Sequence, residues 1–222
     1  VAACKQAGAS NVYLVEEPLA AAIGARIPIS QPSGHMIVNL GGGTVEIAVI
    51  SLGQLVSYKT VRTAGTKIDE AIMNHLRKNH NLIIGERTAE EIKMRIGNTF
   101  VNGKEDYQEK TMEVRGRDFQ TGLPKIVELG EKTISEGIQK PLKQILEGIK
   151  EVLRQTPPEL AADIVDKGIV LSGGSSLLIN IDAFVTYYSG VPAFVVEDPL
   201  LCVIRGVGMI IENLDRFKEA IR

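Results

Sequence analysis

The chain has 222 residues, of which 44% are hydrophobic and 23% charged, a composition typical of a folded globular protein and not of a disordered one. Its 25 basic and 27 acidic side chains leave a formal net charge of -2, so no strongly basic field is available to attract nucleic acid. No apolar run approaches the ~18 residues of a membrane helix and no signal-peptide pattern occurs, which predicts a cytoplasmic protein without direct membrane insertion.

The first third of the chain predicts one helix and a buried β-meander. Residues 11–15 form a short apolar run that we expect to be a strand, and Pro18 opens an alanine-rich helix that ends near Gly24. Three apolar segments then follow, joined by glycine turns, and we predict that they form strands at 35–40, 44–51 and 55–62.

The middle of the chain changes to helical spacing at Thr66, and we expect that helix to end at Gly85. A capping box at 88–91 predicts a second, short helix that runs to about Gly97. Residues 100–129 lack helical period and predict short strands of a small α+β insertion.

The last third begins with a second capping box, at 133–136, which opens the strongest amphipathic helix of the chain. We expect Pro141 to kink this helix and Pro157-Pro158 to end it. Strand, helix, strand and helix follow, at 168–171, 175–188, 193–196 and 199–214. This alternation predicts an α/β fold whose sheet is partly parallel.

The two cysteines predict no special chemistry. Cys4 and Cys202 occur in apolar surroundings outside any CxxC or Cys/His cluster, so we expect two core thiols in a reducing compartment and no zinc site. The chain begins at Val1, and its first eight residues read like the end of a helix already under way, so we expect a piece of a longer protein.

Two glycine corners could hold an anion. Gly41-Gly42-Gly43-Thr44 lies between two predicted strands, where glycine lets backbone amides approach a phosphate and the threonine hydroxyl adds a donor. Ser172-Gly173-Gly174-Ser175 lies between a strand and a helix, where free amides meet the positive end of the helix dipole. Each corner is also consistent with a plain turn, which by itself is the better interpretation of Gly41-Gly42-Gly43, and neither is the GxxxxGK[ST] phosphate loop.

Two further features are ambiguous by themselves. Glu90 and Lys93 lie one turn apart on a predicted helix, where they could reach ribose hydroxyls or form an exposed ion pair. Glu17 precedes Pro18 at a helix start, where the macrodipole favours a carboxylate and where it could also orient a water that attacks a γ-phosphate.

The order of these motifs along the chain resembles that of the actin, heat-shock chaperone and sugar kinase superfamily, and within it the MreB type of bacterial actin. Five longer blocks carry the MreB resemblance, which covers essentially the whole chain: Glu16–Ala25, Gly85–Lys93, Val114–Asp118, Thr121–Pro124 and Thr156–Leu160.

The resemblance implies an actin-like, ribonuclease H-like α/β domain, the second of two large domains, with a mixed sheet flanked by helices. The larger subdomain would comprise residues 1–62 and 129–222, and the smaller inserted α+β subdomain residues 63–128. An ATP site built from two domains cannot close with one of them, so we expect this piece alone to bind nucleotide weakly and to be inactive.

The resemblance also implies roles for individual residues in binding ATP or ADP with Mg²⁺. Glu17 is similar to the catalytic glutamate, and Thr44 to its partner in holding the water. The remaining positions would contact the nucleotide: Asn39, Gly42, Gly43, Thr44, Glu90, Glu91, Ile92, Lys93, Ser172, Gly173, Gly174 and Ser175.

The sequence departs from the family pattern at Asn39, where the family usually has an aspartate that helps to hold the hydrated Mg²⁺. An amide would serve only as an indirect, water-mediated metal contact, so we expect weaker Mg²⁺ retention and slower hydrolysis. The other departures are Ala64-Gly65-Thr66 in place of Gly-Gly-Asp, and Ser175 in place of a third glycine. Together they are typical of a divergent paralogue.

The function implied is that of an ATP-binding cytoskeletal protein that polymerises and maintains cell shape, with hydrolysis coupled to polymer dynamics. Its partners would be copies of itself and a membrane-anchored adaptor of the RodZ type, so that filaments can associate with the membrane. Two alternatives stay open: a degenerate, non-hydrolysing filament subunit and, less favoured, a metabolic kinase of the same superfamily.

Overall fold

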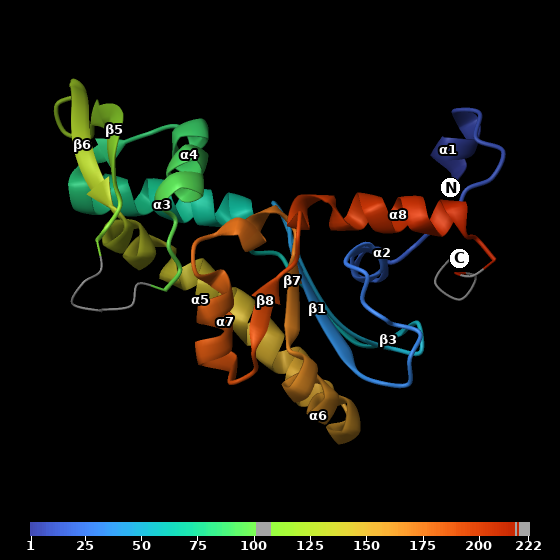
Figure 1. Cartoon of the computed structure of the whole chain (residues 1–222). Coiled ribbons are helices and arrows are strands. Elements are labelled where there is room, and N and C mark those ends of the chain that lie inside the picture. The colour runs from blue at the N-terminus through green and yellow to red at the C-terminus, as the bar shows by residue number, and fades with distance from the viewer. Residues whose placement is uncertain (101–107, 216, 218–222) are drawn as a thin grey trace.

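The computed structural model describes residues 1–100, 108–215 and 217, which form two β-sheets with helices around them (Figure 1). The α-helices are α1 (Ala2–Gln6), α2 (Glu17–Gly24), α3 (Gly65–His80), α4 (Glu86–Ile96), α5 (Glu131–Gln155), α6 (Pro158–Lys167), α7 (Ile181–Ser189) and α8 (Cys202–Glu212). The short 3₁₀ turns are η1 (Gly174–Leu177) and η2 (Pro199–Leu201). The strands are β1 (His35–Leu40), β2 (Val45–Ser51), β3 (Gln54–Val61), β4 (Leu82–Ile83), β5 (Thr111–Asp118), β6 (Pro124–Gly130), β7 (Ile169–Ser172) and β8 (Ala193–Val195).

The larger sheet has five strands in the order β3-β2-β1-β7-β8. The strands of the predicted meander pair antiparallel, whereas β1 pairs parallel with β7 and β7 with β8. The expected mixed sheet is therefore confirmed. Because β1 and β7 are parallel, with Asn39 opposite Ser172, the turns that follow them leave the sheet at the same edge.

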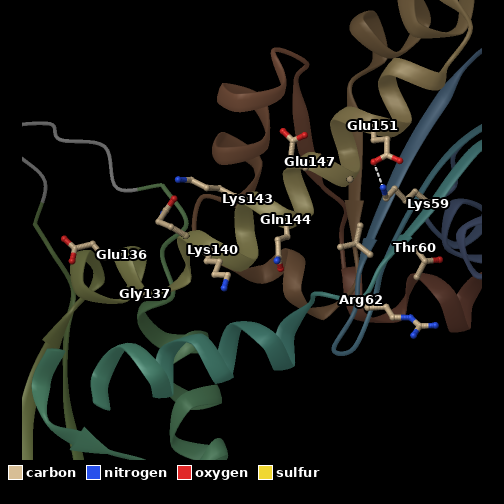
Figure 2. A pocket seen from close by; sticks show the side chains of 13 residues that line it. Lys59, Thr60, Arg62, Glu136, Gly137, Lys140, Lys143, Gln144, Glu147 and Glu151 are labelled. Atoms are coloured by element: carbon tan, nitrogen blue, oxygen red, sulfur yellow. Dashed lines mark hydrogen bonds and ion pairs between the residues drawn. The ribbon is translucent and has the colours of Figure 1, made fainter. Parts of the chain in front are cut away.

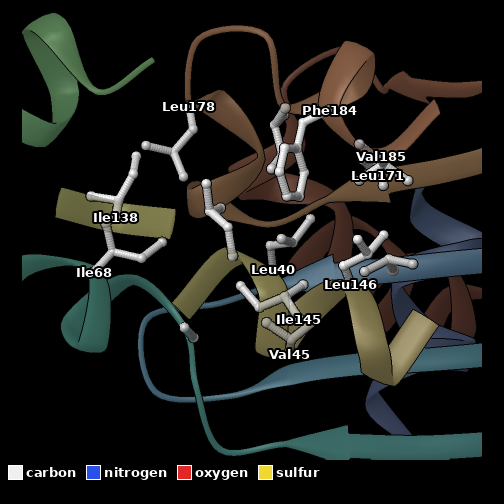
Figure 3. Close-up of a cluster of buried hydrophobic side chains, with 14 of the residues drawn as sticks. Leu40, Val45, Ile68, Ile138, Ile145, Leu146, Leu171, Leu178, Phe184 and Val185 are labelled. Carbon is white, nitrogen blue, oxygen red and sulfur yellow. The ribbon is translucent and has the colours of Figure 1, made fainter. Parts of the chain in front are cut away.

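Both faces of this sheet are covered. Side chains of α5 and α7 pack against one face, and those of α2 and α8 against the other. The first core extends to both predicted glycine corners, because Leu40 ends β1, Leu178 follows η1 and Ile68 projects from α3 into the same cluster (Figure 3). Apolar packing in the core therefore holds the segments that flank both corners in place.

The smaller sheet has the order β4-β5-β6 and lies with α3 and α4 at the end of the molecule opposite α1 (Figure 1). Strands β5 and β6 confirm the expected short strands after residue 100, whereas β4 lies where a helix was expected; residues 101–107 lie outside the described part of the chain. All the elements of this sheet fall between Gly65 and Gly130. The proposed boundaries at 62 and 129 stay a prediction.

Helix α5 runs without interruption through Pro141. A proline inside a helix costs about 3 kcal/mol. Ile138, Leu142 and Ile145 of the same helix are buried in the core, and the burial of each side chain contributes about 2 kcal/mol to stability. Tertiary packing therefore outweighs the local penalty.

Several local expectations were wrong at element boundaries. Both capping boxes fail, because α4 starts at Glu86 and α5 at Glu131, each after a glycine in extended conformation that has no side-chain cap. Helix α3 ends at His80, since Asn81 adopts a left-handed conformation with φ 48°, so the helix stops before Gly85.

Other expectations failed because burial cannot be read from a short apolar run. Residues 11–15 form no strand; Val15 makes only an isolated bridge. Cys4 is exposed, and only Cys202 is a core thiol. Pro157-Pro158 ends α5 and also starts α6, a helix missed in the sequence because Ile164 is its one buried side chain.

Candidate functional site

A cleft of about 720 Å³ opens at the edge of the larger sheet where β1 and β7 end. Segments far apart in the sequence form its walls: the start of α2, the turn after β1, the first turn of α3, one face of α4, and the η1 and η2 turns. Its lining residues are Glu17, Asn39, Gly41, Gly42, Gly65, Thr66, Asp69, Glu90, Lys93, Met94, Gly173, Gly174, Ser175, Leu177, Leu178, Pro199, Leu200 and Val203.

The two glycine corners meet directly in this cleft. The Ser175 hydroxyl donates a hydrogen bond to the Gly41 carbonyl at 2.8 Å, although 134 positions separate the two residues. The Gly65 and Thr66 amides donate to the carbonyls of Gly41 and Gly42 at 3.2 and 2.8 Å. The first glycine turn therefore caps the start of α3 and is tied to the second corner.

Glycine is required at Gly173. Its φ of +84° is a conformation that other residues rarely adopt, and a Cβ there would collide with the Leu40 carbonyl oxygen. Gly65 is similarly confined, since a Cβ would lie 2.7 Å from the Ser175 hydroxyl. Gly42, by contrast, has open space around it, so backbone can face a ligand there.

Glu17, Asn39 and Ser172 form a hydrogen-bonded chain at one end of the cleft. The Asn39 side-chain nitrogen donates to the Glu17 Oε1 at 2.7 Å, and the Ser172 hydroxyl donates to the Asn39 Oδ1 at 3.0 Å. Asn39 and Ser172 are buried, whereas Glu17, the first residue of α2, is exposed. The sequence placed these residues at the site but did not predict that they contact one another.

Lys93 is held in an ion pair that the sequence did not predict. Its ammonium contacts Asp69 Oδ2 at 2.8 Å and the Gly65 carbonyl at 3.4 Å, which ties α4 to the first turn of α3. Burial raises the pKa of the Asp69 carboxyl, and the Lys93 hydrogen bond and charge oppose that rise. Glu90, on the same side of α4, stays exposed at the cleft.

Five of the predicted site residues do not line the cleft: Gly43, Thr44, Glu91, Ile92 and Ser172. Ile92 is fully buried in the core, and Glu91 pairs with Arg95 at 2.8 Å. Ser172 is fully buried and reaches the cleft only through Asn39. The roles of all five stay predictions that no contact with a ligand has tested.

The apolar wall of the cleft was missed by the sequence analysis. Met94, Leu177 and Leu200 are 68%, 57% and 66% exposed, yet all three line this cleft, from α4, η1 and η2. Exposed apolar side chains beside glycine backbone suit a ligand with a flat, apolar part and an anionic part. No periodic pattern marks such residues, because they come from three separate elements.

A larger hollow, of about 870 Å³, lies elsewhere, between α5 and β3 (Figure 2). It is lined by basic and acidic side chains in similar numbers, among them Lys59 of β3, which pairs with Glu151 of α5. It has neither a pair of glycine corners nor an apolar wall. We therefore assign function to the smaller cleft on its chemistry and not on its size.

The described residues supply no metal cage, since no three or more His, Cys, Asp or Glu side chains gather to hold an ion. At the cleft, the Asn39 oxygen already accepts from Ser172, and the amide nitrogen faces Glu17. One lone pair of the Asn39 oxygen is thereby used inside the protein, and the expected water-mediated contact of Asn39 with Mg²⁺ stays a prediction. Separately, no helix of the described residues is both long and apolar enough to cross a bilayer.

Comparison with known proteins decides the family. The sequence profile of the family described as MreB/Mbl protein matches residues 1–219. The chain belongs to the MreB/Mbl family. It is 42% identical over 221 residues to the cell shape-determining protein Mbl of Bacillus cereus, and 46% identical over 209 residues to the cell shape-determining protein MreB of Escherichia coli. These matches cover 99% and 94% of the chain but only 65% and 59% of the two relatives.

Solved structures confirm the actin-like fold. The ADP-bound crystal structure of MreB5 of Spiroplasma citri superposes with a TM-score of 0.91 at 35% identity, over 97% of this chain and 64% of that one. A MamK double helical filament matches with a TM-score of 0.69 at 22% identity, over 89% of this chain and 58% of that one, a likeness that concerns the fold alone. The chain thus spans between 59% and 65% of the length of these MreB and Mbl relatives.

Proposed function

We propose that the full-length protein is an ATP-binding, filament-forming bacterial actin of the cytoskeleton that maintains cell shape and couples ATP hydrolysis to polymer dynamics. The observation that carries this proposal is the hydrogen bond between Ser175 and Gly41, which joins two glycine corners in one cleft. Membership of the MreB/Mbl family supports it, as does the MreB5 relative, which is bound to ADP in one structure and to AMPPNP in another.

The cleft suggests where each part of an adenine nucleotide would lie. The phosphates would face the backbone of Gly42 and Gly174, where glycine lets amides approach an anion, while the Gly173 amide donates to the Pro199 carbonyl at 2.9 Å and holds the second corner in shape. The base would pack on the apolar wall of Met94 and Leu200, and the ribose would lie near Glu90 and Lys93 on α4. Each contact is a proposal for the full-length protein.

For hydrolysis, we propose that Glu17 orients the attacking water, with Thr44 as its partner. The water oxygen would bond to the γ-phosphorus as the bond to the bridging β–γ oxygen breaks, ADP would leave with the electron pair, and the water would lose a proton to the Glu17 carboxylate. Glu17 lies at the positive end of α2, which favours a carboxylate there. Mg²⁺, which neutralises phosphate charge in such reactions, would enter with the nucleotide and be held by its phosphates and by water.

The same proposal covers organisation and partners. Residues 1–62 and 129–222 would form the larger subdomain and residues 63–128 the smaller one. The protein would be cytoplasmic, would bind copies of itself, and would reach the membrane through an adaptor of the RodZ type. The alternative of a non-hydrolysing filament subunit is favoured by one observation, the amide of Asn39 at the site of the usual acid.

Two assays on the full-length protein test the proposal. Sedimentation with and without ATP should show ATP-dependent polymer, and titration with a fluorescent ATP analogue should show saturable binding. A protein that binds no adenine nucleotide would refute the assignment, and one that binds and polymerises but releases no phosphate would support the non-hydrolysing alternative.

A substitution of Glu17 tests the catalytic role. Glu17→Gln should slow phosphate release at least about tenfold, because an amide is a poor acceptor for the proton of the attacking water, and should leave ATP affinity within about twofold. Glu159→Gln is the matched control, since Glu159 also stands in the first turn of a helix, α6, but outside the cleft. Equal rates for both variants would exclude Glu17 as the group that orients the water.

A further inference from the structure

Asn39 contributes to the candidate site through a contact that its family resemblance does not explain. Its amide lies between an exposed carboxylate, Glu17, and a fully buried hydroxyl, Ser172. A carboxylate only accepts hydrogen bonds, so the amide nitrogen must face Glu17 and the amide oxygen must face Ser172. The chemistry of the two neighbours therefore determines the orientation of the side chain.

This orientation turns the Asn39 amide oxygen toward the sheet interior and its amide nitrogen toward Glu17. The oxygen, the one atom of this side chain that could accept from a water of hydrated Mg²⁺, gives one of its two lone pairs to the fully buried Ser172 hydroxyl at 3.0 Å. What Asn39 presents toward the cleft is a donor. A donor aimed at a dication or its inner waters would be unfavourable, whereas a donor aimed at a carboxylate 2.7 Å away is favourable.

The neighbouring strand explains why an amide suits this place. Asn39 is paired in register with Glu46 of β2, so both side chains leave the same face of the sheet. Glu46 is itself buried and accepts from Thr60 at 2.8 Å and from Tyr58. An acid at position 39 would add a third carboxylate between Glu17 and Glu46, which only a cation or a proton could compensate.

We propose that Asn39 is a positioning residue: its amide, and not a metal ion, holds the Glu17 carboxylate in the place that hydrolysis requires. An exposed glutamate loses side-chain entropy when it is fixed, and a charge-assisted hydrogen bond from a buried amide offsets that loss. The bond occupies Oε1 and leaves Oε2 to accept from the attacking water. This inference rests on the proposed ATPase function, and it adds how the site tolerates the loss of the family's usual acid.

Removal of the donor tests the proposal in the full-length protein. Asn39→Ala should slow single-turnover phosphate release about tenfold or more, since a small misplacement of a reacting group can cost that much, and should change the ATP dissociation constant by less than about twofold. Ser172→Ala should slow release by a few-fold, because it frees the amide to rotate. Ser57→Ala, a buried serine on β3 of the same sheet, is the control and should leave the rate unchanged.

Asn39→Asp separates this role from metal retention. If Asn39 positions Glu17, the aspartate variant should be slower than wild type at limiting free Mg²⁺ and recover as Mg²⁺ is raised. If Asn39 only weakens Mg²⁺ retention, the same variant should be faster than wild type at every Mg²⁺ concentration, most of all at limiting Mg²⁺. The two interpretations therefore predict opposite signs in one titration.

Three outcomes would overturn the proposal: an Asn39→Ala rate equal to wild type in a protein with an unchanged unfolding midpoint, a faster Asn39→Asp variant at limiting Mg²⁺, or a wild type that binds ATP and releases no phosphate. In the last case nucleotide binding and the filament assignment would stand. A wild type that binds no nucleotide at all would instead refute the proposed function.

Discussion

Two hollows of the described residues, the cleft at the sheet edge and the hollow along α5 and β3, differ in chemistry more than in size. The hollow along α5 and β3 is the larger of the two, at about 870 Å³, but charged side chains of both signs line it, and two of them, Lys59 and Glu151, form a salt bridge. The cleft at the sheet edge is smaller, at about 720 Å³, and it combines glycine corners, an apolar wall and a glutamate held by an amide. Backbone donors and apolar surface that face a common space are what a nucleotide requires; exposed ion pairs are not.

The comparison also shows what builds a site. The hollow along α5 is lined mostly by side chains of one helix and one strand. The cleft depends on backbone that is brought together by the parallel pairing of β1 and β7, with Asn39 opposite Ser172. Substitutions should therefore have large effects in the cleft and small effects in the hollow, as the next four predictions specify for the full-length protein.

The largest effect is expected at Gly173. Gly173→Ala should lower the free energy of unfolding by about 3 kcal/mol and abolish measurable ATP binding, because a methyl group meets the Leu40 carbonyl at a φ of +84°. Chemical denaturation and ATP titration measure both. Gly190→Ala is the control, with a φ of +77° and open space around it, and should cost about 1 kcal/mol without affecting binding. Similar effects of the two variants would mean that Gly173 is only a strained turn.

The next effect is expected at Lys93. Lys93→Met leaves the Asp69 carboxylate, whose Oδ1 already has no hydrogen-bond partner, buried without its cation, which should cost about 2–3 kcal/mol at pH 7. Lys67→Met, which breaks an exposed pair with Glu70, should cost less than about 0.5 kcal/mol. Unfolding midpoints in urea compare the two.

The loss of unfolding free energy in Lys93→Met should depend on pH, and its direction follows from the pKa of Asp69. Burial raises the pKa of Asp69 in the fold, and removal of Lys93 raises it further, so the charged form is penalised above that pKa. The penalty should therefore be full at neutral pH and shrink as pH falls toward the unfolded pKa of about 3.9. A penalty that stays constant down to pH 4.5 would show that the loss is one of packing and not of charge.

A smaller effect is expected at the bond between the corners. Ser175→Ala removes the hydrogen bond to Gly41 and should weaken ATP binding about fivefold, equivalent to about 1 kcal/mol. Ser189→Ala, which removes a similar bond from a serine to the Val191 carbonyl at 3.2 Å, should leave ATP affinity unchanged. Unchanged affinity in Ser175→Ala would indicate that the corners keep their positions through the core alone.

The smallest effect is expected in the hollow along α5. Lys59→Met should change stability by no more than about 0.5 kcal/mol, because the side chains of Lys59 and Glu151 are 34% and 44% exposed. ATP affinity should not change. A loss of nucleotide binding in this variant, measured by the same titration, would erase the functional distinction between the two hollows.

Much of the fold could be predicted from the sequence where a local pattern coincides with burial. The meander at β1 to β3 and the apolar stripe of α5 follow from strand and helix periods that the core rewards. Element starts could not be predicted, because α4 and α5 begin at glycines whose conformation depends on the chain arriving from elsewhere. The two capping boxes were real patterns, but they lie inside helices that had already begun.

The sequence alone determined that two glycine corners exist, that Glu17 stands at a helix start and that position 39 carries an amide, because each of these is a matter of which residue stands where. Only the tertiary structure decided that Ser175 meets Gly41, that Lys93 pairs with Asp69 and that Asn39 faces Glu17. The physical reason is that these contacts join residues from 22 to 134 positions apart, and such contacts form only when the packing of a sheet and its helices brings the segments together. The spacing of residues along the chain does not predict these contacts.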